Sequence, residues 1–116
     1  MADPIEVQLV AVLNPLVASQ VFPLIAEDGT TGSYLTYQNI VNSPENTLSD
    51  GISINNTRMQ IDCWADDYAT VKALEKAVAD ALTAAAFTNI PRSSRDGYEP
   101  LTKKFRVILD YSLWWN

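Results

Sequence analysis

The stretch TRMQIDCWADDY, residues 57 to 68, carries the two signals that decide the fold of this chain. Apolar and polar residues alternate from residue 58 to residue 64, as they do in a β-strand with one buried face. The residues expected on the buried face are Met59, Ile61 and Cys63. Two adjacent acids, Asp66 and Asp67, follow the strand directly. They mark either the start of a helix or a cluster of acids that performs chemistry.

An amphipathic helix is expected from Asp67 to about Ala86, because apolar residues recur there at steps of three and four. The expected apolar stripe consists of Val71, Leu74, Val78, Ala81, Leu82 and Ala85. A carboxylate at a helix start accepts hydrogen bonds from free N–H groups and lies at the positive end of the helix dipole. The sequence therefore predicts that Asp66 and Asp67 both cap this helix.

The rival hypothesis for the acids is a magnesium cluster of Asp62, Asp66 and Asp67, joined by Asp110, in a nuclease or other hydrolase. The remaining inventory favours no such chemistry. The chain has no histidine, one cysteine and only four glycines, none of them in a phosphate-binding loop. We therefore expect a protein that is not an enzyme, with no catalytic residue, no cofactor and no metal.

A second alternating stretch, residues 103 to 115, predicts a strand that lies antiparallel to the first. One alignment satisfies both faces of the two strands. On the polar face it sets Arg58 opposite Asp110 and Asp62 opposite Arg106, with opposite charges paired across the strands. The other pairs in this alignment are Gln60 with Ile108, Met59 with Leu109, Ile61 with Val107, and Cys63 with Phe105.

The remaining segments complete a single domain over residues 1–116. In chain order, the expected elements are a helix from Pro4 to Leu13 capped by Asp3, strands at Val21–Ile25 and Tyr34–Val41 that form a hairpin, and long mobile loops at about residues 42–56 and 88–102. Consecutive strands with segregated helices favour an α+β fold. We expect a mainly antiparallel sheet with two helices packed on one face.

Composition limits the classes of partner. With 47% hydrophobic and 19% charged residues, the chain has the composition of a folded globular protein. Its net charge of -6 repels nucleic acid and anionic lipid. A single cysteine, Cys63, suits a reducing compartment. No apolar run approaches the roughly 20 residues that cross a bilayer, so we expect a soluble protein inside a cell.

The adjacent residues Trp114 and Trp115 must project from opposite faces of their strand. The alternation places Trp115 inward and Trp114 outward. Trp114, Trp64 and Ile108 would then share the face without helices, as an apolar group of the kind found at interfaces. Two alternatives stay open: the rings are covered by a fraying strand end or a folded-back loop, or this face is a small module that binds an apolar ligand or one protein.

A basic concentration lies at Arg92 and Arg95, with Lys103 and Lys104 just beyond them. Such a group can contact a phosphate or an acidic partner. It can equally be a solvated loop that offsets nearby acids. The sequence alone leaves both interpretations open.

Several stretches together resemble the tail completion, or tail terminator, proteins of long-tailed bacteriophages. They are VFPLIAEDGTTGSYLTYQNI, NSPENTLSDG, RMQIDCWADDYATVKALEKAVADAL and DYSLWW. The order of elements matches over nearly the whole chain, and the most specific piece is the R-x-Q-I-D-x-W-A strand followed directly by the helix. None of these motifs is catalytic, so the resemblance implies an architecture and not a reaction.

The resemblance implies a phage-encoded or prophage-encoded subunit that forms a ring of six copies on the end of the tail tube. The ring would stop tail growth and present the head–tail joining surface, so its partners would be further copies, the tube protein and the head connector, with no membrane. DNA would only pass through its lumen. The protein would lie in the virion, and in the host cytoplasm during assembly. The interface residues we expect are Trp64, Ile108, Trp114, Glu45, Asn46, Leu48, Arg92 and Arg95.

Overall fold

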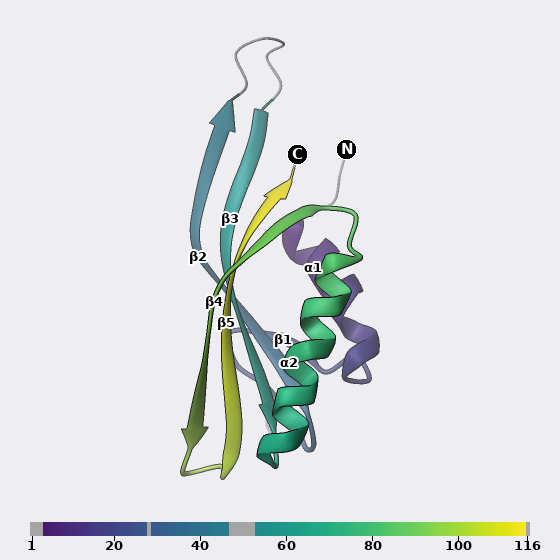
Figure 1. Cartoon of the computed structure of the whole chain (residues 1–116), viewed down its shortest axis with the longest axis vertical. Helices are drawn as coiled ribbons and strands as arrows, with labels where there is room; N and C mark the ends of the chain where they lie inside the picture. The colour runs from purple at the N-terminus through teal and green to yellow at the C-terminus, as the bar shows by residue number, and fades with distance from the viewer. Residues whose placement is uncertain (1–3, 28, 47–52, 116) are drawn as a thin grey trace.

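A computed structural model describes residues 4–27, 29–46 and 53–115, with the side chains of 42–46 and 53–54 left out. The chain forms two layers, a long twisted sheet and two helices that cover one face of it (Figure 1). Its elements are α1 (Ile5–Leu13), the 3-10 turn η1 (Asn14–Leu16), β1 (Val21–Pro23), β2 (Tyr34–Asn46), β3 (Ser53–Ala65), α2 (Tyr68–Thr83), β4 (Thr88–Glu99) and β5 (Lys104–Trp115). The α+β fold with a mainly antiparallel sheet is confirmed.

The strand order is β1-β2-β3-β5-β4, and only the contact of β1 with β2 is parallel. The expected hairpin of these two strands is therefore wrong. After β1 the chain reverses at Leu24, which has a φ of 64°, and returns along residues 25–33 to begin β2 in the same direction. The side chain of Gln20 secures this return segment, because its Nε2 donates to the carbonyl of Ser33 at 2.9 Å.

The core lies between the helices and the inner face of β3 and β5. Met59, Ile61 and Cys63 are fully buried there, as the alternation predicts. The helices contribute Ile5, Leu9, Leu13, Val71, Leu74, Val78 and Leu82 to the same cluster. Full burial of a side chain of this size contributes about 1.5–3 kcal/mol to folding. The apolar stripes of both helices thus fix which face of the sheet they cover.

Both helices lie where the sequence predicts them, but their first or last residues differ from the predicted ones. In α1 the cap position is Pro4, which therefore precedes the first helical residue. The expected cap Asp3 lies outside the described residues. Helix α2 ends at Thr83 instead of Ala86, since its C-cap is Ala84. Among the described residues, no helix combines the length and the apolar character needed to span a membrane.

Both segments expected as loops contain strands. Residues 42–46 pair with residues 53–57 as the outer part of β2 and β3, and residues 88–99 form β4 along β5. Residues 88–99 lack apolar alternation because none of their side chains is buried in the core. Almost every side chain of β4 is at least partly exposed, and a register shift falls between Pro91 and Ser93. Backbone pairing, which has no side-chain signature, holds both segments to their neighbouring strands, and polar side-chain contacts with α2 add to it in β4.

Strands β3 and β5 are antiparallel neighbours as expected, but their register differs by two residues from the predicted one. Ile61 lies opposite Leu109 and Asp62 lies opposite Ile108. Because side chains alternate with a period of two, a shift of two residues leaves each side chain on its predicted face. The assignment of faces is therefore right even though the individual pairs are wrong.

Candidate assembly surfaces

The outer sheet face, which is the face of the sheet opposite the helices, has charged pairs at its centre. Arg106 donates to Asp62 at 2.6 Å, and Arg58 pairs with Asp110. Both pairs bridge β3 and β5 diagonally, because the register shift separates the partners along the strands. The Asp62 side chain is only 9% exposed and also accepts from Gln60 at 3.1 Å. A nearly buried carboxylate with two partners makes this part of the face rigid and polar.

An aromatic cluster occupies one end of the outer sheet face. The ring of Trp64 stacks on Tyr34 with centroids 5.7 Å apart, and the guanidinium of Arg106 lies 4.9 Å from its centroid. Its indole N–H donates to Thr36 Oγ1 at 3.0 Å. Burial raises the pKa of Tyr34 above its usual value. Trp64 is thus held on both ring faces and at its nitrogen.

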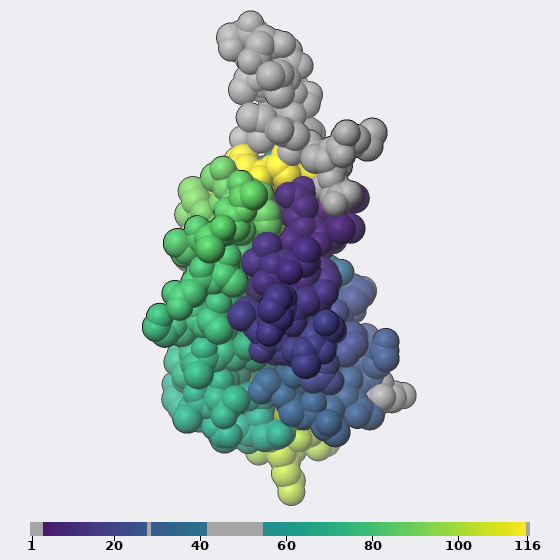
Figure 2. Space-filling view, turned by 90° about the vertical axis from the view of Figure 1, so that its right-hand side faces the viewer, coloured from purple at the N-terminus to yellow at the C-terminus, as the bar shows by residue number. Residues whose placement is uncertain are grey.

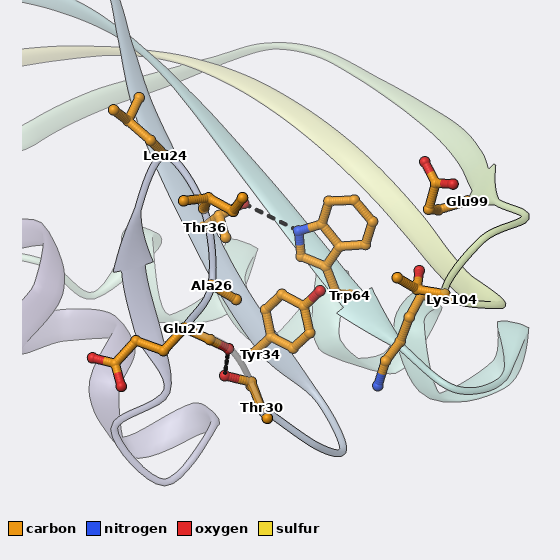
Figure 3. Close-up of a pocket in the computed structure, with 12 residues that line it drawn as sticks. Leu24, Ala26, Glu27, Thr30, Tyr34, Thr36, Trp64, Glu99 and Lys104 are labelled. Atoms are coloured by element: carbon orange, nitrogen blue, oxygen red, sulfur yellow. Dashed lines mark hydrogen bonds between the residues drawn. The ribbon is translucent and has the colours of Figure 1, made fainter.

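A pocket of about 540 Å³ opens beside this cluster (Figure 3). Its walls are the return segment after β1, the start of β2, the end of β3, and the β4–β5 turn. The lining residues are Leu24, Ile25, Ala26, Glu27, Gly29, Thr30, Tyr34, Thr36, Trp64, Glu99, Thr102 and Lys104. Leu24 and Ile25 at its rim are 70% and 78% exposed. The return segment after β1 thus lines the same pocket as Trp64, whose side chain is half-buried.

Sequence reasoning missed Tyr34, Leu24 and Ile25 as parts of this surface. The apolar run of residues 21–25 has the appearance of a buried strand, and only the reversal at Leu24 turns its end outward. A non-glycine residue with positive φ gives no pattern in a sequence. Gly29 and Gly32, which also have positive φ, are the one available signal that a reversal lies nearby.

The single apolar group of Trp64, Ile108 and Trp114 does not form, although these residues do lie on the outer sheet face. Trp64 is opposite Arg106, Ile108 is opposite Asp62, and Trp114 pairs at the far end of β3. The Asp62–Arg106 pair separates the apolar residues, so the expectation of a continuous patch is wrong. On the other face Trp115 packs against the core and donates to Thr57 Oγ1 at 3.0 Å.

The two acids after β3 have different roles. Asp67 caps α2, since its carboxylate accepts from the backbone N–H of Thr70 at 2.8 Å and from the Thr70 hydroxyl at 2.8 Å. These hydrogen bonds lower the pKa of Asp67 below its usual value. Asp66 does not cap the helix. It pairs with Lys104 at 2.8 Å and thereby ties the start of α2 to β5.

The geometry gives the magnesium hypothesis no support. Asp62 binds Arg106, Asp66 binds Lys104, and Asp67 caps α2, while Asp110 binds Arg58. Within residues 4–27, 29–46 and 53–115, no three acids, cysteines or histidines converge on one point. Cys63 is equally unsuited to nucleophilic chemistry, because burial raises its pKa to about 12.

The outer parts of β2 and β3, residues 42–46 and 53–57, form an arm (Figure 1). Residues 55–57 of the arm also pair with β5, and its tip, residues 45–46 with 53–54, is two-stranded. The expected interface residues Glu45 and Asn46 are in its β2 strand, and Leu48 lies outside the described residues. β1 pairs only with residues 35–37 of β2. Among the described residues, no strand pairs with the edge of β2 after that point. Ile40 and Val41 beside this edge are 44% and 48% exposed.

The edge strand β4 brings Arg92 and Arg95 to the outer sheet face. The Nε of Arg92 donates to Ser112 Oγ on that face at 2.8 Å, and Arg95 lies opposite Ile108. Both arginine side chains are exposed. In the part of the chain that the structure describes, neither forms an ion pair with a carboxylate. They are therefore charges available to a partner.

The helix side of β4 is instead tied to α2 by acids. The Nζ of Lys72 lies 2.7 Å from Glu75 and 3.2 Å from Asp96, and the hydroxyl of Tyr68 donates to Asp96 at 2.7 Å. Ser94 donates to Glu75 at 2.6 Å. This network fixes the edge strand against the helix and places carboxylates on the helix side of the molecule.

The family model for tail completion protein gp17 matches residues 7–116. The chain belongs to this family. Its recognition from sequence as a tail completion protein is thereby confirmed, and the family places it among structural proteins of phage tails. No match was found among curated proteins.

A solved chain from the virion of a native gene transfer agent particle shares the fold of this tail completion protein. The TM-score is 0.61 at 20% sequence identity, and the match covers 94% of this chain and 89% of that chain. At this identity the likeness concerns the fold alone. The two-layer architecture described above is therefore one that a virion component also adopts.

Proposed function

We propose that six copies of this tail completion protein form a ring on the end of the phage tail tube, where the ring stops tube growth and presents the head–tail joining surface. The observation that carries this proposal is the family match over residues 7–116. The proposed partners are further copies, the tube protein and the head connector. The proposed location is the virion, after assembly in the host cytoplasm, and the gene would belong to a phage or prophage.

The shape of the subunit supports a ring. A ring that is built by rotation uses two different patches on each copy, one for each neighbour. The molecule measures 51 × 24 × 23 Å, and its two broad sides differ: one is the helix layer and the other is the outer sheet face. The arm extends along the long axis, where it can reach the tube or a neighbour. We propose it as a contact element, together with Glu45, Asn46 and Leu48.

The proposal assigns no catalytic step to the protein. Each acid of the magnesium hypothesis has a structural partner, and a ring acts through shape and contact. DNA is proposed to pass through the lumen without specific binding, since a net charge of -6 repels a phosphate backbone. Arginines on the outer sheet face would then face neighbouring copies, away from the lumen.

A second candidate function is a small module that binds an apolar ligand or a single protein. The observation that favours it is the pocket beside Trp64, with the exposed residues Leu24 and Ile25 at its rim. This function predicts a defined one-to-one complex in place of a ring. Substitution Leu24→Ser would weaken such a complex and would leave ring assembly unchanged.

The ring is tested by the oligomeric state of the purified protein. Size-exclusion chromatography with light scattering at rising concentration is expected to show a shift from the 12.8 kDa monomer toward a six-copy species. Purified tubes should promote the same species, visible as a cap at one tube end in electron micrographs. Protein that stays monomeric with and without tubes would contradict the proposal.

A further inference from the structure

The arginines of this chain all reach one side of the molecule. The sequence contains four of them, and each projects from or bonds to the outer sheet face. They are Arg58, Arg92, Arg95 and Arg106. The arginines are accompanied on this face by Lys104 and, among the described side chains, by three acids: Asp62 and Asp110, which are already paired, and Glu99, which lies opposite Lys104. This side is therefore basic in a chain whose net charge is -6.

The opposite side is acidic. Figure 2 shows α1 and α2 lying next to each other over this face. The acids of the helix side are Glu6, Asp67, Glu75, Asp80 and Asp96, against the cations Lys72 and Lys76. Glu6 accepts from Asn39 at 2.7 Å and has no cationic partner among the described residues. The two broad sides of the subunit thus carry opposite charge.

We propose that the helix layer of one copy docks on the outer sheet face of the next copy. The proposal rests on the ring proposed above and names the two patches that the ring would join. Opposite charges on opposite sides favour a head-to-tail arrangement, and like sides repel each other. The arrangement would also bring the free charges of Arg92 and Arg95 near acids, and would cover Ile108 and Trp114.

A second copy fits the arginines better than a polyanion does. The basic face would attract nucleic acid, but the molecule as a whole, with fourteen acids and eight bases, would repel it. A neighbouring copy offers an acidic surface whose carboxylates are held at fixed positions by the helices. Asp80 and Glu6 lie on different helices of that surface, so both helices would take part in the contact.

Charge reversal tests the pairing of the two patches. Arg92→Glu with Arg95→Glu is expected to weaken self-association about ten- to a hundredfold at low salt. Glu6→Lys with Asp80→Lys should weaken it similarly. One chain with all four changes should regain association, because both patches have changed sign. The control is Lys103→Glu, which reverses a charge in the β4–β5 turn that belongs to neither patch and should change little.

The outcomes separate this inference from the ring itself. If the unaltered protein forms rings and the reversed variants assemble equally well, the docking of helix layer on sheet face is wrong and the ring stands. If the fourfold variant stays dissociated while circular dichroism shows it folded, the two patches do not meet. If Arg92→Glu with Arg95→Glu abolishes DNA binding and leaves assembly intact, the basic face serves nucleic acid. A protein that forms no ring overturns both proposals.

Discussion

Replacing Ile61 by alanine is expected to lower the free energy of unfolding by about 2–5 kcal/mol. Ile61 is fully buried on the helix-covered face of the central strand β3, which lies between β2 and β5. Truncation removes its apolar contacts and leaves a cavity that close-packed neighbours refill only in part. Urea titration of the monomer, followed by tryptophan fluorescence, measures the change.

The matched control is Ile108→Ala, the same truncation one strand away on the outer sheet face. Ile108 lies opposite Asp62 and is only partly buried. This truncation should lower the free energy of unfolding by less than about 1.5 kcal/mol, since no enclosed cavity remains. Equal losses from the two variants would mean that the outer sheet face is buried to the same degree as the core, against the two-layer fold.

Removing the carboxylate of Asp62 by substitution with alanine is expected to cost about 1–3 kcal/mol. The Asp62 side chain is 9% exposed and holds Arg106 at 2.6 Å. Without the Asp62 carboxylate, the charged guanidinium of Arg106 has no counter-ion in a partly desolvated site above the Trp64 ring. The cost stays below that of breaking a fully buried pair, because the Arg106 side chain is 32% exposed and retains some water.

An exposed ion pair with a similar separation serves as the comparison for the Asp62–Arg106 pair. Lys76 and Asp80 in α2 are 3.0 Å apart, with side chains 78% and 68% exposed. Asp80→Ala should change the free energy of unfolding by less than about 0.5 kcal/mol, because water and salt screen such a pair. A double-mutant cycle of Asp62 with Arg106 isolates the first pair. A coupling energy near zero for Asp62 and Arg106 would mean that this pair does not stabilise the sheet, contrary to this prediction.

The central elements were predictable because burial imposes periodicity on a sequence. The alternation at residues 58–64 and 103–115 and the stripe of α2 follow from which side chains enter the core, and the structure buries Met59, Ile61 and Cys63 accordingly. The cap at Asp67 was predictable for a related reason, since a helix start needs an acceptor for its free N–H groups.

The periphery was not predictable in this way. β4 and the arm pair with their neighbouring strands through the backbone, and their sequences are rich in polar residues, so they have the composition of loops. The parallel contact of β1 depends on the reversal at Leu24, whose positive φ has no sequence signal. Edge strands and short parallel strands therefore escape pattern analysis.

Charge pairs across β3 and β5 were predicted correctly from a register that is wrong by two residues. Long arginine side chains reach diagonal partners, so Arg58 still finds Asp110 and Arg106 still finds Asp62. The same shift makes little difference to the buried face. The expected apolar patch failed for the opposite reason: Trp64 and Trp114 are fixed near opposite ends of β3, and no side chain bridges that separation.

The measurement that tests the central claim most directly is the length of phage tails made with and without this protein. Electron microscopy of tails from cells that lack the gene should show tubes of variable, extended length with no cap and no attached heads, and adding purified protein should restore capped ends that join heads. Tails of normal, uniform length that join heads in the absence of the protein would contradict the account.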